Sequence, residues 1–379
     1  MRVLLAGVST RAAAESAARA GFAVTAIDAF ADADQHPGVD AQALRGRFSA
    51  DAAALLAQTI SCDAVAYGSN FENHPRAVDR LAAGRRLWGN ASEVIRRVRD
   101  PALLSRALRQ RGLPAPAVPD NESQAPPPTS HSEWLLKPRA SGGGQRVRRW
   151  RHGMRLPPGC YLQEFLDGTP ASVAFVAARQ RVVPIGFCRQ LIGEESFGAS
   201  GFRYCGNILT AAGDDDDAVD AVCALAGAVG EEFGLVGVNG IDVIIHRGVP
   251  YAIEANPRWC ASMELIERAY GLSVFGVHAA ACRDGEAADF DLRRARRAAQ
   301  AVGKAIVFAR RDVMIGDLRA RLSDSAGAGD LRDIPNPGTP IRSGRPVCTV
   351  FAAGRDAAAC RDQLTRRAAA VYASLDAML

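Results

Sequence analysis

Two carboxylates and an amide occupy matching positions in a segment with the pattern of a β-hairpin. Asp242 and Glu254 are equally far from Gly248, and each lies in a run of alternating Ile, Val, Tyr and Ala residues. A hairpin that turns at Gly248 would set the two carboxylates opposite each other, with Cβ atoms roughly 4.5–5.5 Å apart. Asn256 follows two residues after Glu254 and would point to the same face, roughly 6.6 Å further along the strand.

Two carboxylates and an amide oxygen on one sheet face repel each other unless a cation lies between them. Oxygen ligands of this kind suit Mg²⁺, which shares its shell with waters and nucleotide phosphates, and Mn²⁺ accepts similar ligands. Arg258 follows as a donor for a further anion. The alternative is a surface hairpin whose acids are there by chance, although the flanking Ile and Val residues indicate one buried face.

The elements before this hairpin predict an α/β region at the N-terminus. Alternating patterns predict strands over 2–6, 23–28 and 63–67 and helices over 10–20 and 50–59, which favours a parallel sheet. The first turn, residues 7–10, lacks GxGxxG, so it gives little support for a dinucleotide site. Loops after such strands commonly bind ligands. Ser9, Asp28 and Ser69 are candidates by position alone, and the loop 68–72 could line a substrate crevice.

A second region is rich in predicted strands. Residues 102–111 predict a helix, and the polar, Pro-rich stretch 119–132 predicts a linker or exposed loop. Strands are expected over 134–138, 147–150, 161–166, 171–177 and 182–186, and helices over 214–233, 261–269, 273–283 and 355–377. Gly234 is the expected end of the helix 214–233. The hairpin therefore belongs to a mixed α+β region that follows the α/β region.

Composition limits the class of protein. The chain has 379 residues, 48% apolar and 23% charged, which suits two or three globular domains. No apolar run approaches the ~20 residues that span a bilayer, and the N-terminus lacks a signal-peptide pattern. The nine cysteines are scattered singly without a CxxC pair, so a reducing cytoplasm is expected, without disulfides or structural zinc. Arginine clusters at 146–151 and 293–297 read as solvated faces or as sites for anionic substrates, and no nucleic-acid motif accompanies them.

The ordered set of motifs resembles the ATP-grasp superfamily of carboxylate–amine ligases and biotin-carboxylase-like enzymes. A Lys-Pro strand leads into a triple-glycine turn, then Gln-Glu-Phe-Leu-Asp-Gly-Thr-Pro, then Asp242, then Glu-Ala-Asn-Pro-Arg. The resemblance implies an ATP-grasp fold, combining α/β and α+β parts. It implies a Rossmann-like pre-ATP-grasp domain over 1–100, the ATP-grasp domains over 101–300 and a small β-rich C-terminal subdomain over 301–379.

The resemblance also implies roles for individual residues. Lys137 would meet the nucleotide phosphates and assist catalysis, and Arg258 would steady the transferred phosphoryl group or acyl phosphate. Asp242, Glu254 and Asn256 would hold Mg²⁺. Cofactor binding would fall to Ser141, Gly142, Gly143 and Gly144 as a phosphate lid, to Gln163, Glu164, Phe165 and Leu166 at the adenine, and to Asp167 at the ribose. The alternatives are a surface lysine, a plain mobile turn and ordinary strand residues.

Two segments depart from the pattern or add to it. The family often has Asp-Lys before the linker, whereas this chain has Asp100-Pro101, and Arg99 or Arg139 could take the place of the lysine. The segment 189–207 mixes glycines, aromatics and arginines, and the equivalent region in the family often closes over the acceptor. Arg189, Ser200, Gly201 and Arg203 are therefore candidate substrate residues, beside Ser9 and Ser69. The alternative is an ordinary strand–loop–strand.

The leading hypothesis is an ATP-dependent, ADP-forming carboxylate–amine ligase that acts on small molecules, with no nucleic-acid or membrane partner. A homodimer is compatible with the sequence. A likeness to predicted ligases of archaea and methylotrophic bacteria implies a one-carbon cofactor pathway of the methanofuran, methylofuran or pterin type. One alternative is a bicarbonate-using carboxylase of the biotin or purine type. Another, of a different class, is a non-catalytic ATP-binding regulator, which the proline at position 101 would favour.

Overall fold

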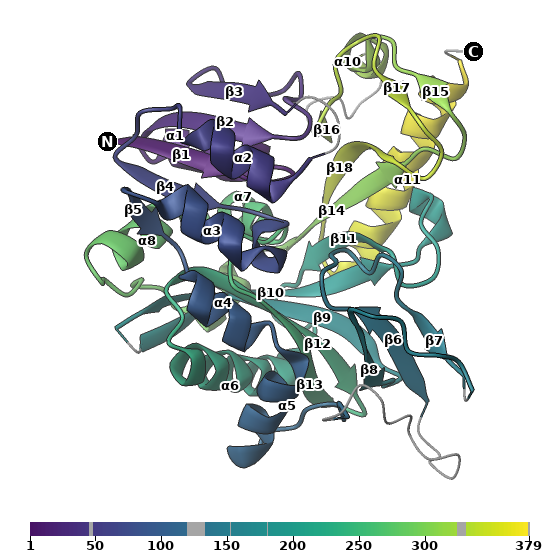
Figure 1. Cartoon of the computed structure of the whole chain (residues 1–379). Coiled ribbons are helices and arrows are strands. Elements are labelled where there is room, and N and C mark those ends of the chain that lie inside the picture. The colour runs from purple at the N-terminus through teal and green to yellow at the C-terminus, as the bar shows by residue number, and fades with distance from the viewer. Residues whose placement is uncertain (45–47, 120–132, 152, 180, 324–330, 378–379) are drawn as a thin grey trace.

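The computed structural model describes residues 1–44, 48–119, 133–151, 153–179, 181–323 and 331–377 (Figure 1). Apart from Pro119, the predicted linker 119–132 lies outside the described residues. No helix within the described ranges is long and apolar enough to cross a membrane.

The N-terminal sheet is parallel, as the alternating pattern predicts. Its five strands run in the order β3-β2-β1-β4-β5. Their bounds are β1 (Arg2–Ala6), β2 (Ala23–Asp28), β3 (Val39–Ala43), β4 (Ala64–Tyr67) and β5 (Arg86–Trp88). One face packs on α2 (Ala50–Ala57) and α3 (Pro75–Ala82), and the other packs on α1 (Arg11–Arg19) and on the much later α8 (Val274–Arg283). Strands β1, β2 and β4 are buried on both faces along nearly their whole length, as in other parallel sheets, whereas β3 at the edge is not.

The strand order reverses at β1, so the loops that follow β1 and β4 lie side by side. The Val8 N–H donates to the Ser69 carbonyl at 3.1 Å. A Cβ atom on Gly7 would come within 3.1 Å of the Gly68 Cα, a contact tighter than ordinary packing, so the two loops cross closely here. Loops at such a reversal form the usual ligand crevice of α/β sheets. The loop after β4 continues into the short helix η1 (Phe71–Asn73).

Two helices lead from this sheet into a small antiparallel sheet. They are α4 (Ser92–Val98) and α5 (Pro101–Gln110). The small sheet has the order β7-β6-β8, formed by β6 (Trp134–Pro138), β7 (Arg148–Trp150) and β8 (Cys160–Glu164). Lys137 lies on β6 and Gln163 on β8, so both predicted strands bring their polar residues to one sheet.

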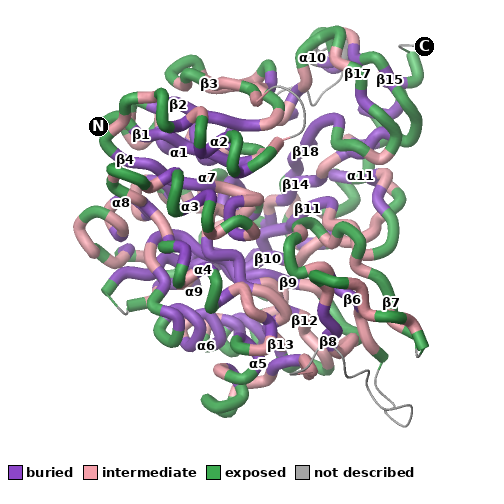
Figure 2. The backbone as a smooth tube through the Cα atoms, viewed as in Figure 1, coloured by how far each residue is buried: buried purple, intermediate pink, exposed green. Residues whose placement is uncertain are grey.

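The largest sheet is antiparallel and has the order β13-β12-β9-β10-β11-β14-β18-β16. Its strands are β9 (Thr169–Ala178), β10 (Arg181–Ile192), β11 (Tyr204–Leu209), β12 (Gly237–His246), β13 (Val249–Asn256), β14 (Ala301–Phe308), β16 (Leu331–Arg332) and β18 (Pro346–Gly354). Helix α6 (Asp216–Phe233) packs on one face, and α7 (Met263–Tyr270) with α8 packs on the other. The buried strands form the centre of the molecule (Figure 2). Gly234 ends α6 in the left-handed conformation, with φ of 61°, as expected.

The C-terminal part extends this large sheet. Strands β14 and β18 pair with each other, and β14 pairs with β11. The long helix α11 (Ala357–Asp376) packs with them in one apolar cluster. The remaining elements are η2 (Glu195–Phe197), α9 (Leu292–Ala298), α10 (Leu318–Ser323) and the pair β15 (Val313–Met314) and β17 (Pro340–Ile341). The division of the chain at residues 100 and 300 stays a prediction.

Candidate functional site

The hairpin β12–β13 sets Asp242 opposite Glu254, as the spacing about Gly248 predicts. The geometry differs from a symmetric turn, however. Arg247 and Gly248 form the two-residue turn, both with positive φ (51° and 79°), and His246 pairs with Val249. Continued without interruption, this register would pair Asp242 with Ile253. A β-bulge after Asp242 shifts the register by one residue and brings Glu254 opposite.

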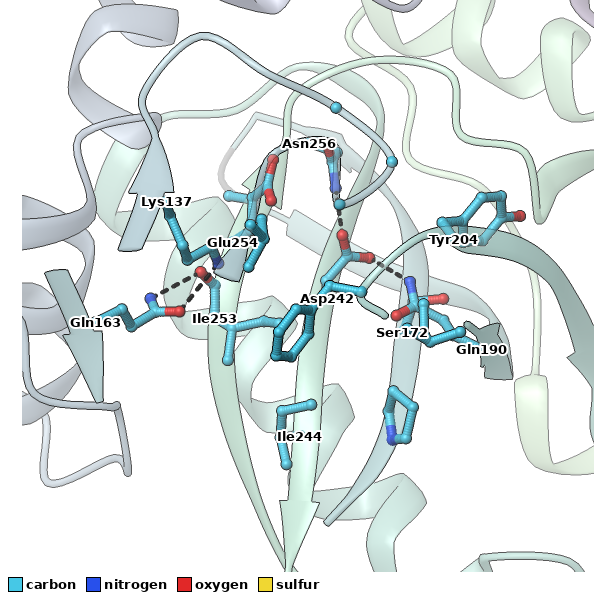
Figure 3. Close-up of a pocket in the computed structure, with 18 of the residues that line it drawn as sticks. Lys137, Gln163, Ser172, Gln190, Tyr204, Asp242, Ile244, Ile253, Glu254 and Asn256 are labelled. Atoms are coloured by element: carbon cyan, nitrogen blue, oxygen red, sulfur yellow. Dashed lines mark hydrogen bonds between the residues drawn. The ribbon is translucent and has the colours of Figure 1, made fainter. Parts of the chain in front are cut away.

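Asp242 is held by two amide side chains. Gln190 Nε2 donates to one carboxylate oxygen at 2.8 Å, and Asn256 Nδ2 donates to the other at 3.0 Å (Figure 3). Burial raises the pKa of Asp242 to about 6, and the neighbouring charge of Glu254 contributes to the same shift. In the absence of a cation, Asp242 is therefore the carboxylate of the pair that takes up a proton first.

Glu254 is held ionised by cations. Burial by itself would raise the pKa of Glu254, but Arg99 and then Lys137 outweigh that effect and lower its pKa. Arg99 forms an ion pair with Glu254 through Nη1 and also donates to the Ala255 carbonyl at 3.1 Å. The two carboxylates thus share a face but differ in surroundings, since one faces amides and the other faces an arginine.

A cavity of about 400 Å³ opens in front of the hairpin. It is lined from the small sheet by Lys137, Ser141 to Gly144, Tyr161 and Gln163 to Gly168, and from the large sheet by Ser172, Gln190, Tyr204, Asp242, Glu254, Asn256 and Arg258. Every residue predicted for catalysis, cofactor binding and metal binding therefore lines one cavity. Its size is within the range of small-molecule sites.

Lys137 is held by Gln163, which also joins the small sheet to the large sheet. Its Nζ donates to Gln163 Oε1 at 3.0 Å, and Gln163 Nε2 donates to the Ile253 carbonyl at 3.1 Å (Figure 3). Only 8% of Lys137 is exposed, which argues against a surface lysine. The chain Lys137–Gln163–Ile253 fixes an ammonium group close to the bulge beside Glu254.

The glycine-rich turn closes over the cavity and touches two distant segments. The Tyr204 N–H donates to the Gly143 carbonyl at 3.1 Å, and Asn73 Nδ2 donates to the Ser141 carbonyl at 3.3 Å. At Gly144 (φ of 70°), an added Cβ would lie 1.8 Å from the Phe202 carbonyl oxygen, so this position accepts only glycine. The turn therefore contacts both the loop before β11 and the loop after β4.

The segment Gln163 to Asp167 forms the end of β8 and the turn into β9. The Glu164 carboxylate accepts from the Ala117 N–H at 2.9 Å, and the Phe165 N–H donates to the Glu133 carbonyl at 2.7 Å. Arg149 lies over the Phe165 ring, 3.8 Å from its centroid. Leu166 and Asp167 line the cavity. Glu164 is thus tied to the chain that enters the small sheet.

Arg258 is held by an ion pair and two hydrogen bonds. Its Nη2 lies 2.6 Å from Glu72 Oε1 and donates to Asn256 Oδ1 at 3.2 Å, while Nη1 donates to the Trp259 carbonyl at 2.9 Å. Burial opposes the charge, but Glu72 outweighs it, and the pKa of Arg258 is raised. Glu72 belongs to η1, so the loop after β4 reaches into the site.

Most of the candidate substrate residues do not line the cavity. Gly201 lines the cavity, whereas Arg189, Ser200, Arg203, Ser9 and Ser69 are not among its lining residues. Arg189 forms a two-pronged ion pair with Asp215, at 2.7 and 2.8 Å. Arg203 donates to the Gly344 carbonyl at 2.9 Å and lies over Phe308. The substrate assignments of these residues stay predictions.

Sequence reasoning did not assign a role to Glu72, Gln190 or Tyr204. Glu72 lies in the segment 68–72 that was expected to line a crevice, and the other two lie in the segment 189–207. Gln190 interrupts an apolar strand with an amide, and that signal could have identified it. The ion pair of Glu72 with Arg258 has no such signal, because the two residues are far apart in the sequence.

The donor set of the hairpin fits a hard divalent cation. Two carboxylates face each other across paired strands, and the Asn256 amide lies 3.0 Å from Asp242. Among the described residues, no three His, Cys, Asp or Glu side chains are grouped to hold a metal, so Asn256 Oδ1, which here accepts from Arg258, would have to complete this set. Oxygen-only ligands favour Mg²⁺ or Mn²⁺ over Zn²⁺.

The raised pKa of Asp242 predicts a pH-dependent effect of Asp242→Asn in chelator. A carboxyl group whose pKa rises on folding destabilises the folded state increasingly as the pH rises above the ordinary value of 3.8, and this effect is complete above the folded-state pKa of about 6. Asp242→Asn should therefore raise the Tm at pH 8, and should change it much less at pH 4, which is close to the ordinary value of 3.8 at which the effect begins. Thermal unfolding in EDTA at both pH values measures this, and a Tm shift equal at both would contradict it.

Comparison with known proteins agrees with this arrangement. The profile of a family described as the ATP-grasp domain matches residues 98–262. Comparison with curated proteins gave no significant match. Residues 98–262 therefore carry an ATP-grasp domain, which includes the small sheet and part of the large sheet.

Solved structures similar to the chain include ligases and carboxylases. The L-amino acid ligase from Bacillus licheniformis has a TM-score of 0.72 at 15% identity, covering 97% of this chain and 96% of that one. N5-carboxyaminoimidazole ribonucleotide synthetase from Thermotoga maritima has a TM-score of 0.67 at 16% identity, covering 97% and 98%. The biotin carboxylase domain of 2-oxoglutarate carboxylase from Hydrogenobacter thermophilus, in complex with MgADP, ADP and bicarbonate, has a TM-score of 0.68 at 15% identity, covering 93% and 86%. At these identities the likeness concerns the fold.

Proposed function

We propose that this ATP-grasp protein is an ATP- and Mg²⁺-dependent carboxylate–amine ligase, which forms an amide through an acyl phosphate and releases ADP and phosphate. The observation that carries this proposal is the cavity in which Asp242, Glu254 and Asn256 face Lys137 and Arg258. The MgADP bound to the similar biotin carboxylase domain supports it.

Each part of the cavity has a role in this reaction. Asp242, Glu254 and Asn256 would hold Mg²⁺, which when bound neutralises phosphate charge and orients the transfer. Lys137 offers a compact positive charge, and the backbone of Ser141 to Gly144 can approach phosphate oxygens closely because the glycines have no Cβ atoms. Gln163 to Leu166 would contact the adenine and Asp167 the ribose.

Arg258 then acts on the reacting group. A substrate carboxylate attacks the γ-phosphorus of ATP, ADP leaves, and the acyl phosphate carries the developing negative charge. The guanidinium of Arg258, held by Glu72, is a preorganised donor for that charge. An amine next attacks the acyl carbon, expels inorganic phosphate and loses a proton, and the amide is formed. The protein contributes mainly position and electrostatics.

Within this reaction class, we propose an amide coupling in the biosynthesis of a one-carbon cofactor of the methanofuran, methylofuran or pterin type. This assignment rests on the sequence resemblance to predicted ligases of archaea and methylotrophic bacteria stated above. The two substrates, a carboxylate and an amine, would then include glutamate or an aromatic amine. The cavity provides aromatic walls at Tyr161 and Tyr204 for such a substrate.

A coupled assay that distinguishes ADP from AMP tests the proposal. The purified protein is supplied with MgATP and a panel of amino acids, other carboxylates, aromatic amines and bicarbonate. We expect ADP only when a carboxylate and an amine are both present. Bicarbonate-dependent ADP formation without an amine would instead identify a carboxylase, the class to which two of the similar structures belong. Tight binding of an ATP analogue without ADP under any mixture would identify a regulator.

A further inference from the structure

The start of helix α5 offers no free group to an anion, although it borders the cavity. Pro101 lines the cavity and has no N–H to donate. The next two amides, of Ala102 and Leu103, already donate to the Asp100 carboxylate at 2.9 and 3.0 Å. A phosphate at this end of the cavity must therefore be neutralised by a side chain.

Arg99 is the side chain that the fold places there. It follows α4 directly, lines the cavity, and is 11% exposed. Its Nη1 holds Glu254 and the Ala255 carbonyl, and its Nη2 donates to Asn73 Oδ1 at 3.0 Å. Asn73 in turn donates to the Ser141 carbonyl of the glycine-rich turn. Arg99 is thus fixed between the hairpin and the turn that closes the cavity.

Not all of the N–H donors of the Arg99 guanidinium are used. Arginine has five N–H donors in a planar fork. Two of them are taken by Glu254 and Ala255 and a third by Asn73, while Nε has no partner within the described parts of the chain. Donors of this kind match the oxygens of a phosphate group, which arginine binds with two parallel hydrogen bonds.

We propose that Arg99 binds the terminal phosphates of the nucleotide, anchored on Glu254 and Asn73. The inference rests on the proposed function, since it assumes that the cavity takes a nucleotide. It deepens that function by assigning the phosphate contact that Pro101 cannot make. Because Arg99 also touches Glu254, the same side chain links the phosphates to the proposed metal ligands.

The test compares nucleotide binding in Arg99→Gln with the wild type by calorimetry. Arg96→Gln is the matched control, since Arg96 lies on α4 too but is half exposed and pairs with Asp79 on the surface. We expect Arg99→Gln to bind MgADP about tenfold more weakly or worse, with unchanged affinity for adenosine, because only phosphates lose a charge-assisted contact. Arg96→Gln should bind both ligands as the wild type does.

Two results would overturn the assignment. One is equal MgADP affinity in Arg99→Gln and the wild type, and the other is an equal loss for MgADP and adenosine. If Arg99→Gln does not fold, Arg99→Lys carries the test: it keeps the charge but cannot form the planar contacts, so MgADP binding should still weaken. Unchanged MgADP binding in Arg99→Lys would then overturn it. A wild-type protein that binds no MgADP would contradict the proposed function itself.

Discussion

Glu254→Ala is expected to reduce ADP formation by about 10³-fold, because it removes one of the two carboxylates proposed to hold Mg²⁺. A cation that neutralises transferred phosphate contributes several kcal/mol to the transition state, and about 4 kcal/mol corresponds to this factor. Steady-state ADP release under saturating MgATP, with the substrate pair found in the panel assay, measures the effect.

The fold should survive this change, since Glu254 is partly exposed and the hairpin is held by the apolar residues Ile241 and Val243. Circular dichroism and the Tm check this point. The control is Glu93→Ala, which removes a carboxylate from an exposed position on α4, away from the hairpin. Removing Glu254 also leaves Arg99 without its anion. Turnover of Glu254→Ala at the wild-type rate would refute the metal assignment.

Arg258→Gln is expected to lower turnover by about 10²–10³-fold, the usual effect of removing one preorganised donor from a developing negative charge. Binding of MgADP should change little, because this nucleotide lacks the group that is transferred. The loss should therefore appear in kcat more than in nucleotide affinity. Single-turnover kinetics and calorimetry with MgADP separate the two quantities.

Stability complicates this variant, because Glu72 is 3% exposed and would be left as a buried charge without its partner. Breaking such a pair commonly costs about 3–5 kcal/mol. The double variant Glu72→Gln with Arg258→Gln removes both charges, and we expect it to recover most of the Tm while remaining inactive. Recovery of turnover together with the Tm would show that Arg258 supports the fold and has no part in the reaction.

The hairpin shows how far a local pattern can predict a site. Alternation and the glycine at 248 placed Asp242 opposite Glu254, and the structure agrees. The route to that pairing differs, since the turn is Arg247-Gly248 and a β-bulge restores the register. Strand β12 also pairs with β9 on its other side, and no short-range pattern in the hairpin reveals the bulge. The prediction was therefore right about the pair and incomplete about its cause.

The sequence by itself determined the elements and the residue types of the site. Periodicity located many of the strands and helices, because burial of one face imposes it along each segment, but it did not locate β3, α3, β5 or α4. The order of the lysine strand, glycine turn and acidic hairpin indicated the ATP-grasp fold, which the profile match to residues 98–262 supports.

Only the tertiary structure decided what each charged group faces. Arg99 meets Glu254, Glu72 meets Arg258, and Gln190 meets Asp242, although each pair is widely separated along the chain. These contacts depend on how the loop after β4, the end of α4 and the large sheet converge, and such long-range packing leaves no periodic signal. The sequence thus named the groups that could do chemistry, and the packing of three distant segments set their partners and their ionisation.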